Sequence, residues 1–367
     1  MLFRSLDAFS FEGKVATVYN FNFGVQSKLP GGFVLDTAYV GSLARHLLQR
    51  VNLNAIPYGA TFLAKNQDPT KVAASPNALL GNNAFNQDFL RPYQGFGNIN
   101  LHQMGGTSNY NSLQVGLNRR FSNGFLLGMA YTWSKALTTA SGDGGFFRID
   151  QFNRKANYGL ADFHRKQTLV LNYVYELPSV AKYMGGKTWM KSAIDGWQLS
   201  GVSAFQTGQP FAVGMSIPSV GNQNLTGSYT EGARINLIGN PVAGIGDEYH
   251  RLNPAAFTLP PVGTLGITAP VNYIIRPGVL NFDFSLQKTF AFAERARLQL
   301  RADAFNVFNH TQFNGINSTL NFTSITNATP TNLPFNADGS LRDKNGFGTV
   351  SGARDPRILQ LVVRFQF

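Results

Sequence analysis

The sequence predicts an all-β protein in which long antiparallel strands cross a membrane as the wall of an up-and-down β-barrel. Three observations lead to this prediction. Apolar and polar residues alternate with a period of two in about nine segments, the connections between these segments alternate between short and long, and only 14% of the residues are charged. Short turns on one side and long loops on the other are typical of bacterial outer-membrane barrels.

The composition favours strands and turns over helices. The 367 residues include 31 Phe, 13 Tyr and 38 Gly. Aromatic residues suit a pleated surface and Gly suits turns. No stretch reaches the roughly 18 to 20 apolar residues of a membrane-spanning helix, so only strands could do the crossing. The absence of Cys excludes disulfides and thiolate metal sites.

The net charge of +12 raises the question of an anionic partner. The Lys and Arg residues are scattered singly through strands and loops, without the dense block that is common in nucleic-acid footprints. We therefore expect outer-membrane lipid and lipopolysaccharide as partners, and no nucleic acid.

Nine segments are predicted as strands because their residues alternate between apolar and polar. They are residues 15–26, 33–41, 110–121, 125–137, 166–178, 195–209, 279–290, 297–310 and 357–367. Each approaches or exceeds the roughly 9 to 11 residues with which a tilted strand crosses a bilayer. Their polar faces carry mostly Ser, Asn, Gln, Gly and Thr, which suits a lumen. The alternative is a soluble sandwich whose aromatic residues fill a core.

The connections favour the barrel over the sandwich. Residues 27–32, 122–124 and 291–296 form short connections, and residues 178–194 form an intermediate one. The long connections are residues 42–107, 135–165, 211–276 and 310–354. Since the last long loop would lie outside the cell, counting strands back from the C-terminus starts the chain outside. The start also lacks a signal-peptide pattern, so we expect residues 1–367 to be the C-terminal portion of a larger barrel.

Five segments, in this order, resemble TonB-dependent receptors, and most closely the Oar-like group. They are NYNSLQVGLNRRFSNGFLLGMAYTWSKAL, YGLADFHRKQTLVLNYVYELP, GWQLSGVSAFQTGQPF, LQLRADAFNVFNHTQF and GARDPRILQLVVRFQF. The resemblance implies about nine to ten strands of a 22-stranded barrel, with the plug and the first barrel strands absent. It also implies uptake of a bulky solute that binds the loops and the plug. TonB would act only through the plug missing from this chain.

The end of the chain has a further implied role. Its alternating apolar residues are Leu359, Leu361, Val363, Phe365 and Phe367. The resemblance implies that this aromatic-ended strand is the signal read by the barrel-assembly machinery. A physical basis exists, because a free edge strand can be captured by strand addition. On the opposite face, Val362 has no evident reason to point to the lumen, and Arg364 would lie near the periplasmic rim.

Three charged residues inside the strands should face the lumen. Asp283, Arg301 and Asp303 alternate with apolar neighbours, and Arg or Lys on the lipid face costs about 2 to 4 kcal/mol at the bilayer midplane. The strand of Asp283 is paired, through the short turn 291–296, with the following strand, which carries Arg301 and Asp303. We expect a lumen salt bridge that fixes strand register rather than binding a ligand.

No constellation predicts catalysis, a metal or a cofactor. The five His residues are spread singly, and none pairs with another His or a carboxylate at metal-ligand spacing. Asp143 and Asp150 lie among glycines without the oxygen-ligand density of a calcium loop. Two other functions remain open: a passive pore or adhesin-like barrel, and a soluble basic β protein that binds nucleic acid or polysaccharide.

Overall fold

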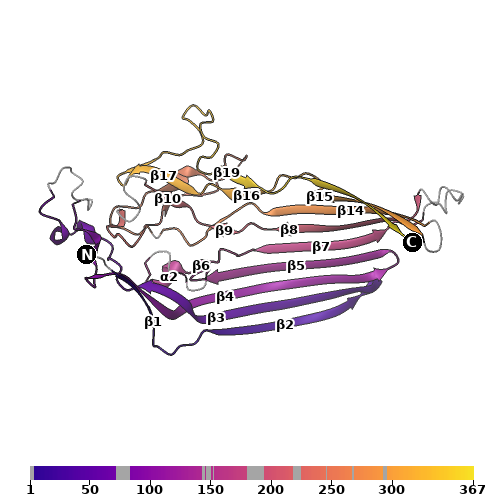
Figure 1. Ribbon diagram of the computed structural model, residues 1–367, viewed down its shortest axis with the longest axis horizontal. Helices are drawn as coiled ribbons and strands as arrows, with labels where there is room; N and C mark the ends of the chain where they lie inside the picture. Colours follow the sequence, from indigo (N-terminus) through magenta and orange to yellow (C-terminus); the bar gives the residue numbers. More distant parts are fainter. Residues whose placement is uncertain are drawn as a thin grey trace.

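The computed structural model describes residues 4–71, 83–142, 145, 150, 151, 153–179, 194–217, 225–244, 246–266, 268–291 and 296–367. Within these residues the largest assembly is an 11-stranded sheet. Figure 1 shows its strands running along the longest axis of the molecule. None of the helices in this part of the chain is long and apolar enough to span a membrane.

Nine long strands form the body of the sheet, and each pairs antiparallel with the next one in chain order. They are β2 (Thr17–Leu29), β3 (Phe33–Asn52), β4 (Phe96–Ser122), β5 (Phe125–Thr138), β7 (Gln167–Glu176), β8 (Trp197–Gln206), β14 (Val279–Ala291), β15 (Arg297–Phe305) and β20 (Ile358–Gln366). Each coincides with one of the nine predicted segments, so the all-β, antiparallel up-and-down architecture is confirmed. Two short strands join them: β1 (Arg4–Phe9) runs parallel to β4, and β6 (Gly159–Leu160) pairs with β5.

The sheet is open within the described residues, with β2 at one edge and β20 at the other. Leu300 on β15 lies opposite Val363 on β20, while Arg301 lies opposite Gln287 on β14. Because side chains alternate along a strand, these pairs belong to opposite faces of the sheet.

One face of this sheet carries a band of exposed apolar side chains. The exposed members of the long strands on this face include Tyr19, Phe21, Phe23, Val25, Leu29, Tyr39, Leu113, Trp133, Tyr175, Leu280, Leu286, Leu300, Leu359, Leu361, Val363 and Phe365. A soluble domain rarely exposes so large a contiguous apolar surface, whereas a lipid-facing barrel wall requires one.

Two glycines let aromatic rings lie across this apolar face. A Cβ at Gly41 would lie 2.2 Å from the ring of Phe21, which is directly opposite on β2. A Cβ at Gly201 would lie 2.6 Å from the Tyr173 hydroxyl and 2.7 Å from the Asp283 carbonyl oxygen. Glycine inside a strand often marks such a close approach.

Two predicted tight turns are confirmed, and both lie at the same end of the sheet (Figure 1). The 3₁₀ turn η1 (Pro30–Gly32) joins β2 to β3. Asn123 and Gly124, with φ of 51° and 74°, join β4 to β5. Positive φ at both central residues is the geometry of a type I′ hairpin turn. The predicted turn at 291–296 and the connection at 178–194 lie largely outside the described residues.

The long connections leave the opposite end of the sheet, as the alternation predicts (Figure 1). One boundary was wrong: β3 continues to Asn52 and β4 begins at Phe96, so much of the predicted loop 42–107 is a strand hairpin. The register shifts between Arg45 and Leu47, where His46 has a positive φ of 53°. A bulge of this kind breaks the period of two, which is why the alternation ends there in the sequence.

The long connections contain many short elements. The helices are α1 (Gln87–Leu90), α2 (Arg154–Asn157), η2 (Ala60–Phe62), η3 (Ala64–Asn66) and η6 (Pro254–Ala256). The strands are β9 (Pro210–Phe211), β10 (Gly214–Ser216), β11 (Asn236–Leu237), β12 (Phe257–Thr258), β13 (Ile274–Ile275), β16 (Phe313–Ile316), β17 (Thr319–Ser324), β18 (Asn327–Pro330) and β19 (Val350–Ala353). Within the described part of the chain they pair only with one another, as β10–β17–β18, β11–β12, β13–β9 and β16–β19.

The buried hydrophobic cluster lies in these connections and not in the sheet. Its members come from the two connections that follow β8 and β15: Phe211, Val213, Met215, Ile217, Leu225, Ile235, Leu252, Ala256, Phe257, Leu259, Ile274, Ile316, Leu320, Phe322, Ile325 and Phe347. Phe322 and Leu320 are fully buried. The loops therefore form a packed body beyond the end of the sheet.

Candidate functional site

The C-terminal strand presents its apolar residues along an open edge. The side chains of Leu359, Leu361, Val363 and Phe365 are 68%, 82%, 71% and 59% exposed. Phe367 follows the strand at 95% exposure, and its ring centroid lies 5.9 Å from that of Phe365. Because β20 pairs only with β15 among the described strands, its other edge can accept a further strand. Recognition of these residues during assembly stays a prediction.

The three charged strand residues share the polar face of the sheet, but they form only one ion pair. The Arg301 guanidinium donates from Nε and Nη2 to Oδ2 of Asp303, at 3.0 and 2.8 Å. Asp283 instead accepts from the backbone N–H of Asn306 and from Asn281 Nδ2, both at 2.9 Å. The salt bridge therefore lies within β15, and Asp283 anchors the chain where β15 ends.

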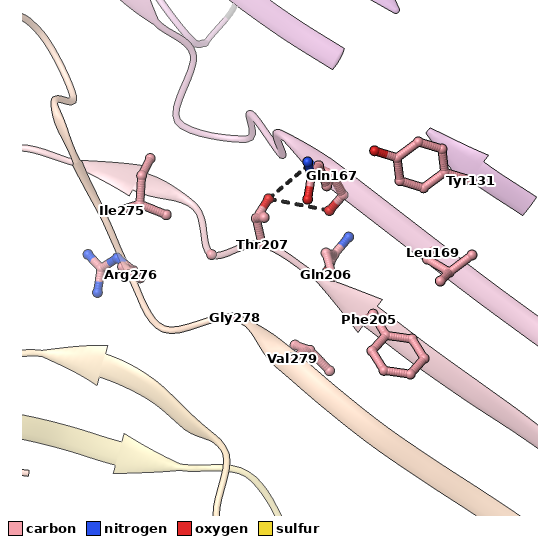
Figure 2. Close-up of a pocket in the computed structure, with 11 residues that line it drawn as sticks. Tyr131, Gln167, Leu169, Phe205, Gln206, Thr207, Ile275, Arg276, Gly278 and Val279 are labelled. Atoms are coloured by element: carbon pink, nitrogen blue, oxygen red, sulfur yellow. Dashed lines mark hydrogen bonds between the residues drawn. The ribbon is translucent and has the colours of Figure 1, made fainter. Parts of the chain in front are cut away.

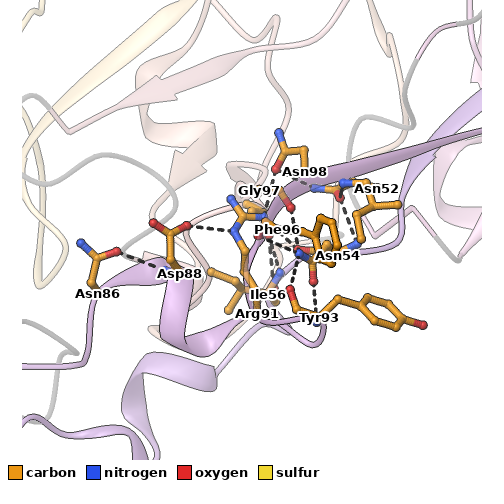
Figure 3. A network of polar contacts seen from close by, with 12 residues as sticks. Asn52, Asn54, Ile56, Asn86, Asp88, Arg91, Tyr93, Phe96, Gly97 and Asn98 are labelled. Atoms are coloured by element: carbon orange, nitrogen blue, oxygen red, sulfur yellow. Dashed lines mark hydrogen bonds and ion pairs between the residues drawn. The ribbon is translucent and has the colours of Figure 1, made fainter. Parts of the chain in front are cut away.

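The first long connection is closed at its base by a buried asparagine, Asn54, as Figure 3 shows. Its Nδ2 donates to the carbonyl oxygens of Tyr93, Phe96 and Gly97, at 2.9, 3.1 and 2.8 Å. Its Oδ1 accepts from the Tyr93 backbone N–H at 2.7 Å. The side chain, at the start of the loop 53–95, thus satisfies backbone groups at the other end of this loop. Burial would make any of these groups costly if left unpaired.

Arg91 extends this network in the direction of the sheet (Figure 3). Its Nη1 donates to the Asn54 carbonyl oxygen at 2.9 Å and to Asn98 Oδ1 at 3.0 Å. Its Nε lies 3.3 Å from a carboxylate oxygen of Asp88, so the charge of this buried guanidinium is paired.

A second set of contacts ties the loop 53–95 to the connection after β8. Ile56, which is fully buried, donates its N–H to Thr230 Oγ1 at 2.7 Å and accepts from Ser228 Oγ at 2.5 Å. The N–H of Gly59 donates to the Thr226 carbonyl oxygen at 2.8 Å. Two loops that are far apart in sequence are therefore held together.

A cavity of about 540 Å³ lies where β7, β8 and β14 meet the loops (Figure 2). Thr207 closes one side, because its Oγ1 accepts from the Gln167 N–H at 3.0 Å. Two glycines allow the chain segments to cross here. A Cβ at Gly208 would lie 1.7 Å from the Arg276 carbonyl oxygen, and one at Gly278 would lie 2.4 Å from that of Gln206.

The described histidines differ in one respect from the sequence prediction, because two of them do lie beside a carboxylate. His102 Nε2 is 3.3 Å from Asp7, and His250 Nδ1 is 2.8 Å from Asp247. The first pair joins β4 to β1, which sequence spacing could not reveal. Within the described residues no group of three His, Cys, Asp or Glu side chains could hold a metal ion.

Comparison with known families shows what kind of protein carries this sheet. The outer membrane β-barrel domain matches residues 3–360, nearly the whole chain. The chain belongs to the outer membrane β-barrel domain family. It therefore lies in the cell outer membrane and crosses it with strands. Family membership excludes the soluble basic β protein that the sequence left open.

Solved structures of three outer-membrane proteins are similar to this chain. The transporter YddB from Escherichia coli is 11% identical with a TM-score of 0.41, and the match covers 96% of this chain and 33% of that one. The ferric-catecholate import receptor Fiu from E. coli is 9% identical with a TM-score of 0.39, and the match covers 96% of this chain and 28% of that one. The FrpB iron transporter from Neisseria meningitidis is 11% identical with a TM-score of 0.38, and the match covers 98% of this chain and 33% of that one. The chain thus spans about a third of their length or less. No curated protein matches the chain.

Proposed function

We propose that the chain forms barrel wall and external loops of a TonB-dependent, Oar-like receptor that takes up a bulky solute with energy coupling. The observation that carries this proposal is the packed body made by the long loops at one end of the strands. A purely passive pore needs no such body. A receptor does, because a preorganised surface loses less entropy when a solute binds.

The open sheet supports the second part of the proposal. With β2 and β20 as free edges, the nine long strands need further strands to close a barrel. We propose that residues 1–367 are the C-terminal portion of the barrel domain, and that other strands and a plug complete it. The role of this portion is structural and ligand-binding, without catalysis.

The partners follow from the same proposal. The exposed β20 edge would pair with the barrel-assembly machinery during insertion, with Phe365 and Phe367 as recognised side chains. Lipid and lipopolysaccharide would surround the apolar face. TonB would act on the plug and not on the residues described above.

The test compares binding with uptake in cells that produce the complete receptor. Labelled solute is measured on the cell surface and inside the cells, with and without TonB and with an uncoupler of the proton gradient. The proposal predicts that binding persists while uptake stops when TonB or the gradient is removed. Uptake that continues unchanged in both conditions would instead support a passive pore.

A further inference from the structure

A second cavity, of about 490 Å³, lies beside the Asn54 network and is lined by three different loops. The end of β3 and the start of β4 supply amide side chains, the segment around α1 supplies Gln87 and Arg91, and residues 229–232 supply the opposite wall. Its volume is within the range of small-molecule sites. Its position between loops that are tied together means that the wall is largely formed before any ligand arrives.

The lining of this cavity is dominated by amides. Five side chains of this type contribute: Asn52, Gln87, Asn98, Asn100 and Gln151. No Leu, Ile, Val, Met or Phe is among the lining residues that the structure describes. An amide can donate and accept at the same time, which is also what a sugar hydroxyl does. A wall of this composition offers little to an apolar ligand.

The charges in the cavity are balanced. Among the described lining residues, Arg91 and Glu231 are charged, one of each sign. Arg91 is already paired with Asp88 at 3.3 Å. An anionic ligand would therefore find no unpaired cation among the lining residues to offset its desolvation cost, and a cationic ligand would find only one carboxyl group.

One atom of the wall has an unmet hydrogen bond. Asn100 Oδ1 is buried and has no partner among the described residues. A buried acceptor without a donor costs about 1 to 3 kcal/mol. Because this oxygen is buried, a ligand hydroxyl in the cavity can supply that donor when the neighbouring side chains move aside.

We propose that this cavity binds a neutral, hydroxyl-rich ligand, namely a glycan. The proposal rests on the function proposed above, because it takes the loops around the cavity to face the outside of the cell. It names the chemical class of the solute or of a segment of it.

The test measures binding of the detergent-solubilised complete receptor to an array of neutral glycans built from hexoses, pentoses and deoxyhexoses. The array also carries sialylated and sulfated glycans and a library of random hexapeptides. We expect binding to at least one neutral glycan. Asn100→Leu, which removes the buried acceptor and keeps the volume, should weaken it tenfold or more.

Gln87→Ala serves as a second variant, because Gln87 is exposed and its replacement leaves folding intact. We expect it to weaken binding about threefold or more, while the matched control Asn20→Ala on β2 leaves binding unchanged. Absence of neutral-glycan binding, equal binding by the Gln87→Ala variant and wild type, or binding only to charged glycans or to peptides would each overturn the proposal.

This experiment needs neither TonB nor a proton gradient, so its outcome is separate from that of the uptake experiment. Glycan binding without energy-dependent uptake would count against the receptor function alone. Energy-dependent uptake of a solute by a protein that binds no glycan would count against the cavity alone.

Discussion

Leu300 lies directly opposite Val363 across the β15–β20 ladder, and the next pair along, Gln299 and Arg364, points to the other face of the sheet. The apolar pair belongs to the exposed apolar band. The polar pair lies on the face that carries the Arg301–Asp303 ion pair. Neighbouring residues of one strand are therefore predicted to meet lipid and lumen respectively.

Replacing these neighbours by arginine should have unequal effects. Leu300→Arg places a charge in lipid, which costs about 2 to 4 kcal/mol near the bilayer midplane, whereas Gln299→Arg places it in the lumen. We expect Leu300→Arg to reduce the heat-modifiable, folded fraction in outer-membrane preparations far more than Gln299→Arg. Equal losses for the two variants would refute the assignment of the faces.

The hydrogen bonds of the Asn54 side chain should keep the loop 53–95 in a fixed conformation. Asn54→Ala removes a fully buried side chain that makes four hydrogen bonds to backbone groups. Leaving one such group unpaired costs about 1 to 3 kcal/mol. We expect faster amide hydrogen exchange in this loop and little change in the strands. Asn20→Ala, on the exposed β2, is the control, and identical exchange in both variants would contradict the role of Asn54.

The chain crossing at Gly208 should tolerate no larger residue. A Cβ there would lie 1.7 Å from a backbone oxygen, so Gly208→Ala must displace the main chain near Arg276. Overpacking of this kind costs about 1 to 3 kcal/mol. We expect a lower melting temperature in detergent. Gly142→Ala, where nothing lies within 4 Å of the new Cβ, should melt like the wild type, and a similar result for Gly208→Ala would disprove the tight crossing.

The free energy of unfolding of the packed body formed by the loops should depend on pH because of Glu231. Burial, and then the nearby charge of Asp150, raise the pKa of the Glu231 carboxyl above its ordinary value of 4.5. The folded protein therefore binds this proton more tightly than the unfolded chain does. The contribution of Glu231 to the free energy of unfolding is therefore favourable at low pH. It is lost as the pH rises from the ordinary pKa of a Glu carboxyl through the raised pKa of Glu231.

The Glu231→Gln variant tests this dependence. Melting temperatures measured in detergent from pH 4 upward should fall less steeply in Glu231→Gln than in the wild type over that window. Parallel curves for the two proteins would show that the environment of Glu231 does not shift its titration.

The sheet was predictable because its residues repeat with a period of two, and that period survives in all nine long strands. Its largest failure was the outer part of the β3–β4 hairpin, beyond Gly41 on β3 and before Tyr110 on β4, where the bulge at His46 resets the alternation. The predicted segment 297–310 also ran past the end of β15 at Phe305. The loop body was not predictable. Its apolar residues, from Phe211 to Phe347, come from two distant connections and follow no repeating spacing.

The polar sites show the same limit. The alternation predicted that Asp283, Arg301 and Asp303 face the lumen. It could not show that the ion pair joins Arg301 to Asp303, nor that Asp283 accepts a hydrogen bond from the Asn306 N–H instead. Asn54 looked like any other loop asparagine, because its partners at residues 93–97 are distant in sequence. Only the chain path brings such residues together.

The central claim is that the chain crosses the outer membrane with its long loops outside and its short turns inside. Residues 1–367 contain no cysteine, so this part of the receptor adds no background to the labelling of single introduced cysteines. On intact cells that produce the complete receptor, a membrane-impermeant maleimide should label Ser340→Cys in the last long loop, and it should label Ser122→Cys beside the β4–β5 turn only after the outer membrane is permeabilised. Labelling of Ser122→Cys but not Ser340→Cys on intact cells, or equal labelling of both, would contradict the account.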